Sequence, residues 1–148
     1  MNFKKIGIFL LYLLPWFLSA ILFRSDSSYY YSLNLPFIAP PPFLFGIVWP
    51  LLYLLIAYTI FKVWDSSDKR YRLILIINYI SNQLFSFFFF TIKNNFLSLI
   101  DTIIILISSI YFYRETQLIN ERYSKYLIPY VIWNAFATIL IFTIFAMN

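Results

Sequence analysis

Five long runs of apolar residues, separated by short charged segments, dominate the pattern along the chain. The runs cover residues 6–23, 43–64, 73–92, 96–113 and 126–147. Each is close to the roughly 20 residues that an α-helix needs to cross a bilayer. The pattern therefore predicts an all-α membrane protein, in which residues 1–148 form a single domain built as a bundle of five transmembrane helices.

Transmembrane strands are the alternative, because the chain is rich in Ile, Phe and Tyr. A strand of a membrane barrel alternates apolar and polar residues over about ten positions. The runs here are continuous, as in residues 51–56, and in lipid a helix satisfies its own backbone hydrogen bonds. A cleavable signal peptide is an alternative for the first run, but the run continues to Phe23 and four further spans follow. We therefore expect a retained first helix.

The basic residues divide unevenly between the two ends of such a bundle. Five spans place Arg24 and Lys93 on one side. The other side then holds Lys4, Lys5, Lys62, Lys69, Arg70, Arg72, Arg114, Arg122 and Lys125. Short loops rich in Lys and Arg stay in the cytoplasm. The distribution therefore predicts an inside N-terminus in a bacterial cell membrane, and it explains the net charge of +5 without a nucleic-acid partner.

The chain contains neither histidine nor cysteine. Histidine is the usual general base and a common zinc and haem-iron ligand, and cysteine supplies disulfides and thiolate ligands. The composition therefore argues against a zinc hydrolase, a His-ligated haem protein and a His-based catalytic triad. We expect no metal site and no resident cofactor.

Polar side chains inside the predicted spans are the main candidates for function. Asn78 and Asn82 are four residues apart and share one helix face, which Phe85 continues. Asn134 and Thr138 have the same spacing in the fifth span. Interhelical hydrogen bonding is the favoured interpretation of the second pair. For the first pair, that interpretation and a ligand-binding role both stay open.

Asp101 is the only acidic residue inside a predicted span. A carboxyl group at that depth must be neutral, paired or close to water. We expect it to be buried and tied to the third helix or to the turn at residues 93–95. Asp101 and Lys93 are therefore assigned structural polar roles.

The connection between the first two spans is rich in proline, with Pro36, Pro40, Pro41 and Pro42 after three consecutive tyrosines. Proline lacks a backbone N–H and favours extended chain before it. The pattern predicts a stiff, non-helical segment. An aromatic belt at the membrane interface explains some of the tyrosines, but not why a rigid segment should lie over the bundle.

Three blocks of sequence resemble the translocator protein family, also called tryptophan-rich sensory proteins or the peripheral-type benzodiazepine receptor family. The first, residues 33–41 with 48–53, is similar to the family's Leu-x-Lys-Pro-x-Trp-x-Pro-Pro loop and Val-Trp-x-x-Leu-Tyr helix start. The second comprises the Asn-rich residues 78–86, the Lys93-Asn94 turn and Asp101. The third, residues 129–138, is similar to the Pro-Tyr-x-x-Trp-x-x-Phe-Ala-Thr signature. The blocks occur in the family's order across nearly the whole chain.

The resemblance implies a five-helix bundle with a pocket roofed by the first loop. It implies a membrane receptor or regulator that binds porphyrins, chiefly protoporphyrin IX, and hydrophobic drug-like ligands, with the lipid bilayer and a second copy of the chain as further partners. The matched ligand-binding positions are Tyr30, Trp49, Asn82, Trp133 and Ala137, with Asn78, Phe85 and Ala135 as neighbours. Light-driven porphyrin degradation, with Trp133 as the catalytic residue, and porphyrin transport are alternatives. A structural membrane protein without a ligand is a third.

The chemistry of a free porphyrin agrees with these positions. Its flat apolar ring can stack on Trp49 and Trp133, and Tyr30 and Asn82 can donate hydrogen bonds to its carboxylates. The sequence also departs from the family pattern, because the loop Trp and Lys are replaced by Phe37 and Leu35. The C-terminal cholesterol-recognition pattern of animal members is absent, so a steroid-importing role is not supported.

Overall fold

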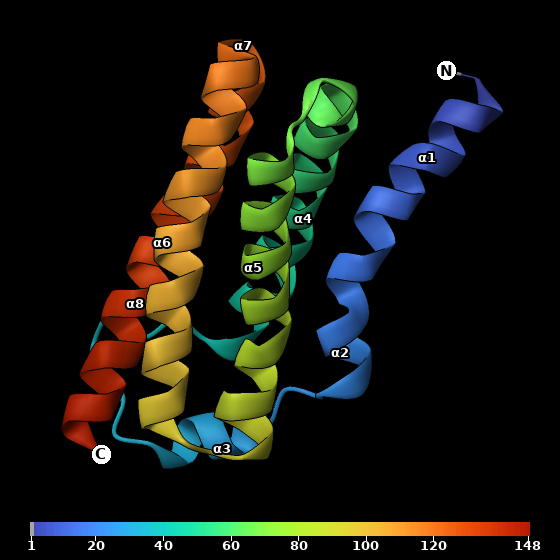
Figure 1. Ribbon diagram of the computed structural model, residues 1–148. Coiled ribbons are helices and arrows are strands. Elements are labelled where there is room, and N and C mark those ends of the chain that lie inside the picture. The colour runs from blue at the N-terminus through green and yellow to red at the C-terminus, as the bar shows by residue number, and fades with distance from the viewer. Residues whose placement is uncertain (1) are drawn as a thin grey trace.

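The computed structural model describes residues 2–148, and these residues form helices without any strand. Five helical segments are long and apolar enough to cross a membrane, which confirms the predicted number of spans and the all-α class. The segments are Phe3–Leu22, Pro42–Ser66, Lys69–Thr91, Asn95–Ile119 and Glu121–Met147. The N-terminus lies at one end of the bundle, and the C-terminus and the first loop lie at the other (Figure 1).

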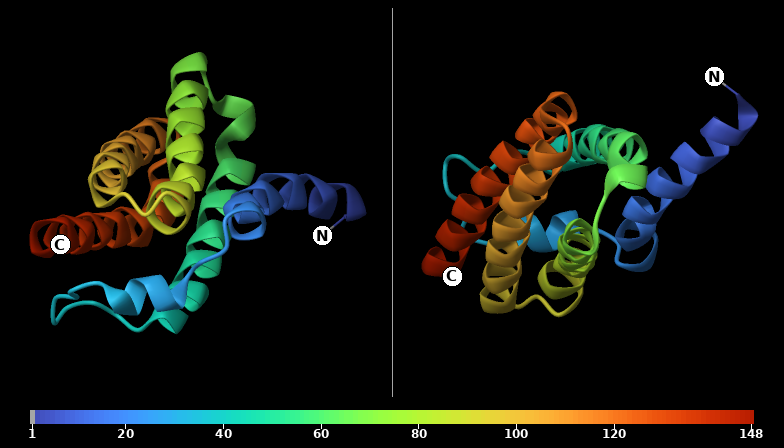
Figure 2. Two further views of the ribbon diagram at one scale, coloured as in Figure 1. Left: turned by 90° about the horizontal axis from the view of Figure 1, so that it is seen from below. Right: turned by 45° about the horizontal axis from the view of Figure 1, so that its top comes forward.

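The segments are built from helices joined by short irregular turns. In chain order these are α1 (Phe3–Leu13), the 3₁₀ turn η1 (Leu14–Phe17), α2 (Leu18–Leu22), α3 (Ser27–Ser32), α4 (Pro42–Val63), the 3₁₀ turn η2 (Trp64–Ser66), α5 (Lys69–Ser86), the π turn η3 (Phe87–Thr91), α6 (Asn95–Ile119), α7 (Glu121–Ser124), the 3₁₀ turn η4 (Lys125–Leu127) and α8 (Ile128–Met147). The helices α4, α5, α6 and α8 form the body of the bundle (Figures 1 and 2).

The first span lies at the edge of this body and leans away from it toward the N-terminus (Figure 1). It is broken at η1, where Pro15 has no backbone N–H to donate to the preceding turn. No residue of α1 is buried. Below the break, α2 packs beside α5, and it forms part of the cavity wall described in the next subsection.

The fourth span is longer than the charge pattern predicted. The sequence suggested an end at Tyr113, before Arg114 and Glu115, but α6 continues to Ile119. Glu115 is only 8% exposed, and its Oε1 lies 3.0 Å from Nε of Arg70 on α5. Because Glu115 forms an ion pair with α5, the helix does not end at this acidic residue, and the interface between α5 and α6 extends past it.

The first loop contains a short helix that the proline pattern did not predict. Asp26 caps α3 by accepting a hydrogen bond from the backbone N–H of Tyr29 at 3.0 Å. The following residues, 33–41, are irregular apart from one turn at Phe37 and Ile38, as the prolines predicted. The loop therefore consists of a capped helix followed by a stiff strap, and it passes beneath α5 and α6 in Figure 1.

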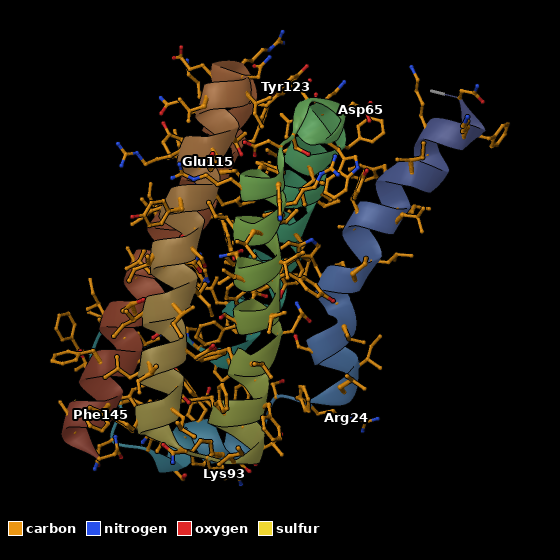
Figure 3. The ribbon with its side chains drawn as sticks, viewed as in Figure 1. Arg24, Asp65, Lys93, Glu115, Tyr123 and Phe145 are labelled. Atoms are coloured by element: carbon orange, nitrogen blue, oxygen red, sulfur yellow. The ribbon has the colours of Figure 1, made fainter. Side chains whose placement is uncertain are left out.

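The half of the bundle nearer the N-terminus is packed solidly, and we call it the solid half. Its core includes Ile56, Val63, Tyr71, Phe112 and Leu127, each at most 1% exposed. Figure 3 places Asp65, Glu115 and Tyr123 toward this end, and Arg24, Lys93 and Phe145 toward the other. We call the half that contains Arg24, Lys93 and Phe145 the hollow half, because it contains a cavity.

Candidate ligand-binding site

The hollow half encloses a cavity of about 620 Å³. Its walls come from α2, α4, α5 with η3, α6 and α8, and its roof comes from the first loop. Ligand pockets in proteins commonly measure about 300–1,000 Å³. The cavity is therefore large enough for a ligand of the size of a drug or a cofactor.

Aromatic rings line much of the cavity. Trp49 of α4 and Trp133 of α8 meet edge to face, with ring centroids 6.4 Å apart and planes at 90°. Phe45 lies 6.0 Å from Trp133. On the opposing α5 segment, Phe85 and Phe89 stack with centroids 5.5 Å apart and planes within 12°. A flat apolar molecule would find both faces and edges of rings in this cavity.

Tyr30 of α3 forms the centre of the roof. Its side chain is 4% exposed, its ring lies 5.9 Å from Phe45, and its hydroxyl donates a hydrogen bond of 2.9 Å to the carbonyl of Pro40. The sequence suggested that this hydroxyl donates to a ligand. In the structure its hydrogen is already used to hold the strap, so toward the cavity the oxygen can only accept.

One edge of the roof is fastened to the turn between α5 and α6. Nζ of Lys93 lies 3.2 Å from Oδ2 of Asp26 and 5.0 Å from the ring centroid of Tyr29, whose hydroxyl donates to Oδ1 of Asn95 at 3.2 Å. Hydrogen bonds from the Ser28 hydroxyl and the Tyr29 N–H, together with Lys93, lower the pKa of Asp26 to about 2. The carboxylate is therefore charged at any physiological pH.

The strap is fastened a second time, to the end of α8. The backbone N–H of Asn34 donates to Oδ1 of Asn148 at 2.9 Å, and Nδ2 of Asn148 donates back to the carbonyl of Asn34 at 3.1 Å. Nδ2 of Asn34 also donates to the carbonyl of Met147 at 3.3 Å. The first loop is thus held at two separate points across the end of the bundle.

Six of the eight ligand-binding positions expected from the sequence line the cavity, namely Tyr30, Trp49, Asn82, Phe85, Trp133 and Ala137. The structure does not place Asn78 and Ala135 among the lining residues. Asn78 is fully buried behind the wall, where its Nδ2 donates to Oγ of Ser108 and to the carbonyl of Ile105. Asn78 lies on the same helix face as Asn82, one turn further from the cavity, and is thus a neighbour of a lining residue.

Comparison with known proteins identifies the family of the chain. The model of the TspO/MBR family matches residues 7–147. The chain belongs to the TspO/MBR family. It is 34% identical to the tryptophan-rich protein TspO of Bacillus cereus over the full length of both chains. It is 36% identical to the uncharacterized membrane protein YtaB of Bacillus subtilis over 86% of this chain and 84% of that one. With the tryptophan-rich protein TspO of Archaeoglobus fulgidus the identity is 30%, over 84% and 83% of the two chains.

In this member of the TspO/MBR family, Asn134 also lines the cavity, which the sequence did not suggest. Its side chain is 2% exposed, and its Nδ2 makes no hydrogen bond with the described residues. The expected interhelical hydrogen bond comes from Thr138 instead, whose hydroxyl donates to the carbonyl of Thr102 on α6 at 3.2 Å. The signal in the sequence was the position of Asn134, three residues before Ala137 on the same helix face.

Asp101 is buried, as the sequence predicted, with 4% of its surface exposed. Of the two expected ties, the one to the third helix is present, because Ser81 of α5 hydrogen-bonds to the carboxyl group. The turn at Lys93 does not supply the other, because Lys93 pairs with Asp26. Within residues 2–148, Oδ2 of Asp101 has no hydrogen-bond partner. Asp101 also does not line the cavity, so it remains a buried structural group.

No charged side chain is among the described residues that line the cavity. The polar groups of the lining are hydroxyls, amides and indoles from residues such as Ser19, Tyr53, Asn82 and Trp133. In this TspO/MBR protein the cavity is thus suited to an uncharged apolar body that carries a few hydrogen-bonding groups.

Proposed function

We propose that this TspO/MBR membrane protein is a receptor or regulator that binds porphyrins, chiefly protoporphyrin IX, and other flat hydrophobic ligands in the cavity under the first loop. The observation that carries the proposal is the roofed, charge-free cavity of about 620 Å³ with Trp49 and Trp133 set at right angles in its wall. The family resemblance supplies the tetrapyrrole as the ligand class.

A free porphyrin combines an apolar ring with carboxylates at one edge. The ring would lie among the aromatic side chains, where stacking is favourable. The carboxylates cannot be buried without a partner, and we expect one beside the amide of Asn82 and the other at the cavity mouth. There Ser25 and Ser27 line the cavity, and Arg24 is exposed on the chain beside them. The ring needs no iron ligand, which suits a chain without His or Cys.

A titration with protoporphyrin IX, followed by quenching of tryptophan fluorescence and by the porphyrin absorption band, tests the proposal. Trp49→Ala and Asn82→Ala each remove one contact and should weaken binding by about 1–3 kcal/mol. Trp64 lies in the solid half against Tyr12 and Arg72, so Trp64→Phe is the matched control and should bind normally. Loss of binding in Trp64→Phe but not in Trp49→Ala would show that the ligand binds in the solid half instead.

Light-dependent porphyrin degradation is a second candidate, and the position of Trp133 favours it. The indole lines the cavity and contacts the rings of Trp49 and Phe45, so an oxidisable side chain would lie beside a bound porphyrin. Illumination of the purified complex should then yield porphyrin products, and Trp133→Phe should abolish them while retaining binding. Product formation that is unchanged in Trp133→Phe would remove this candidate.

We further propose that the solid half faces the cytoplasm, because nine of the 11 basic residues belong to that side. The chain has no native cysteine, so a single Ser67→Cys substitution between η2 and α5 gives a clean reporter. An impermeant thiol reagent should label it only after the membrane is opened. Labelling of intact cells from outside would reverse the orientation.

A further inference from the structure

A chain of buried side-chain hydrogen bonds runs from the cavity wall into the interior of the bundle. It begins at Asn82 of α5, whose Nδ2 donates to the hydroxyl oxygen of Tyr130 on α8 at 3.4 Å. Tyr130 donates to Oδ1 of Asn78 at 2.8 Å, and Nδ2 of Asn78 donates to Oγ of Ser108 on α6 at 2.8 Å. Only Asn82 among these residues lines the cavity.

The direction of every hydrogen bond at the inner end is determined by one backbone carbonyl. The carbonyl of Ile105 can only accept, and it receives Nδ2 of Asn78 at 3.2 Å and the hydroxyl of Ser108 at 3.1 Å. Because the Ser108 hydrogen is used there, Oγ of Ser108 must accept from Asn78. The amide nitrogen of Asn78 therefore faces α6, and its oxygen faces Tyr130.

The other end of this series of hydrogen bonds is held in the same way, by backbone groups of the broken first span. The backbone N–H of Ser19, which can only donate, binds Oε1 of Gln83 at 2.8 Å. The carbonyl of Trp16, which can only accept, receives Nε2 of Gln83 at 3.3 Å. The Gln83 amide is thus fixed in one orientation, and its nitrogen also lies 3.4 Å from Oδ1 of Asn82, to which it donates.

These two ends together determine which way the carboxamide of Asn82 is turned. Its Oδ1 accepts from Gln83 and from the hydroxyl of Tyr53, the latter at 3.3 Å. Its Nδ2 gives one hydrogen to Tyr130, and the second hydrogen has no partner among the described residues. A flipped amide would place its nitrogen against the nitrogen of Gln83, which can only donate, and its oxygen against a hydroxyl whose hydrogen is already used.

We propose that Tyr130, Asn78 and Gln83 are positioning residues that hold Asn82 with an N–H toward the cavity, so that the site selects flat apolar ligands bearing a carbonyl or carboxylate oxygen. This inference rests on the proposed porphyrin-binding function. The bonds to Asn82 are longer, at 3.3–3.4 Å, than the 2.8 Å bonds behind it. The amide is therefore oriented, yet it has room to move onto a ligand oxygen.

Two tetrapyrroles that differ in carbonyl groups test the selection. Protoporphyrin IX dimethyl ester carries ester carbonyls, and etioporphyrin has only alkyl substituents on the same ring. The wild-type protein in detergent should bind the ester about 5–10-fold more tightly, the effect of one hydrogen bond. Tyr130→Phe removes the acceptor of one Asn82 hydrogen and leaves only Gln83 and Tyr53 to orient the amide, so it should lower this ratio by about threefold, with the affinity for etioporphyrin unchanged.

Tyr126→Phe is the matched control, because Tyr126 lies one turn earlier and packs against Tyr58 in the solid half. It should leave the ratio as in the wild type. Ser108→Ala is a milder second variant, which removes one acceptor of Asn78 and should reduce the ratio by about twofold. It keeps the test available if Tyr130→Phe does not fold.

The outcomes separate this inference from the function on which it rests. If the wild type binds neither porphyrin, the proposed function fails. If it binds both and the ratio is already one, or is unchanged in Tyr130→Phe and Ser108→Ala, the positioning role is wrong. An equal loss of affinity for both porphyrins would show that Tyr130 serves only to hold the fold together.

Discussion

In the solid half of the bundle, Ile56, Tyr71, Phe112 and Leu127 are fully buried and form one cluster. In the hollow half, the same helices α4, α5, α6 and α8 surround a cavity of about 620 Å³. Both halves are built from apolar and aromatic residues, so composition does not distinguish them. The difference shows that the same helices pack closely over one half of their length and surround a cavity lined by mutually contacting rings over the other.

The ends of the two halves are also closed differently. The solid half is joined by the ion pair between Arg70 and the nearly buried Glu115, which links α5 directly to α6. The hollow half is covered by a separate segment that is fastened at Lys93 and at Asn148. We therefore expect substitutions in the solid half to change stability, and substitutions in the hollow half to change ligand binding.

The largest expected effect is that of Phe112→Ala in the solid half. The ring is fully buried, so its removal leaves a void and should cost about 3–5 kcal/mol of unfolding free energy. Phe85→Ala is the matched control, because that ring already borders the cavity and should cost clearly less. Denaturation in mixed detergent micelles measures both. Equal losses would show that the two halves are packed alike.

One substitution made at two positions separates the halves most directly. Ala57→Leu inserts a large side chain at a fully buried position of the solid half and should destabilise the fold by about 1–3 kcal/mol. Ala137→Leu inserts the same side chain into the cavity wall and should block protoporphyrin IX while thermal stability is retained. The division is wrong if Ala137→Leu unfolds the protein and Ala57→Leu does not.

Asp101→Asn tests a group that belongs to the hollow half but not to the cavity. Its carboxyl group is 4% exposed, and Oδ2 lacks a partner among the described residues. A carboxyl group at that depth without a cationic partner is held neutral, so an amide of the same shape should change stability by less than about 1 kcal/mol. Porphyrin affinity should not change. A stable variant that loses binding would instead make Asp101 a ligand contact.

The smallest expected effect concerns the roof. Because the pKa of Asp26 is lowered to about 2 from its usual 3.8, its ion pair with Lys93 is fully formed above about pH 4 and is lost as pH falls toward 2. Between pH 5 and 8 the rate of ligand dissociation should not respond to this group. Asp26→Asn should raise that rate by about twofold, as expected for an exposed pair.

Stopped-flow dilution of the porphyrin complex measures the rate. Glu121→Gln, which breaks the exposed pair with Lys125 in the solid half, is the control and should leave the rate unchanged. A dissociation rate that is the same in Asp26→Asn and in the wild type would mean that this fastening does not control ligand release.

The five spans could be predicted because charge and apolar length act locally, residue by residue. The end of the fourth span could not, because the pairing of Glu115 with Arg70 joins residues that are 45 positions apart. The short helix α3 was also missed. The signal for α3 was Asp26, a helix-capping residue, followed by two serines. The prolines that come later in the loop led to the prediction of a non-helical segment.

The candidate site shows the same division. Helix periodicity placed Asn82 and Phe85 on the cavity face, and the family motif placed Trp49, Trp133 and Ala137 there. Neither indicates which atoms remain free. The hydrogen bond from the Tyr30 hydroxyl to the carbonyl of Pro40 depends on how the first loop folds back on itself. The absence of a partner for Nδ2 of Asn134 depends on how the helices pack.

The turn that fastens the roof carries a backbone cost that glycine would avoid. Lys93 has φ of 58°, the only positive value among the described residues, whereas Gly7 and Gly46 lie in ordinary helical backbone. A left-handed residue with a side chain costs about 1–2 kcal/mol. Glycine at position 93 would remove this strain and, with it, the ammonium group that reaches Asp26. Lys93→Gly would therefore stabilise the turn but remove the ion pair that holds the roof to it. Selection for thermostability alone would be expected to favour the loss of this ion pair.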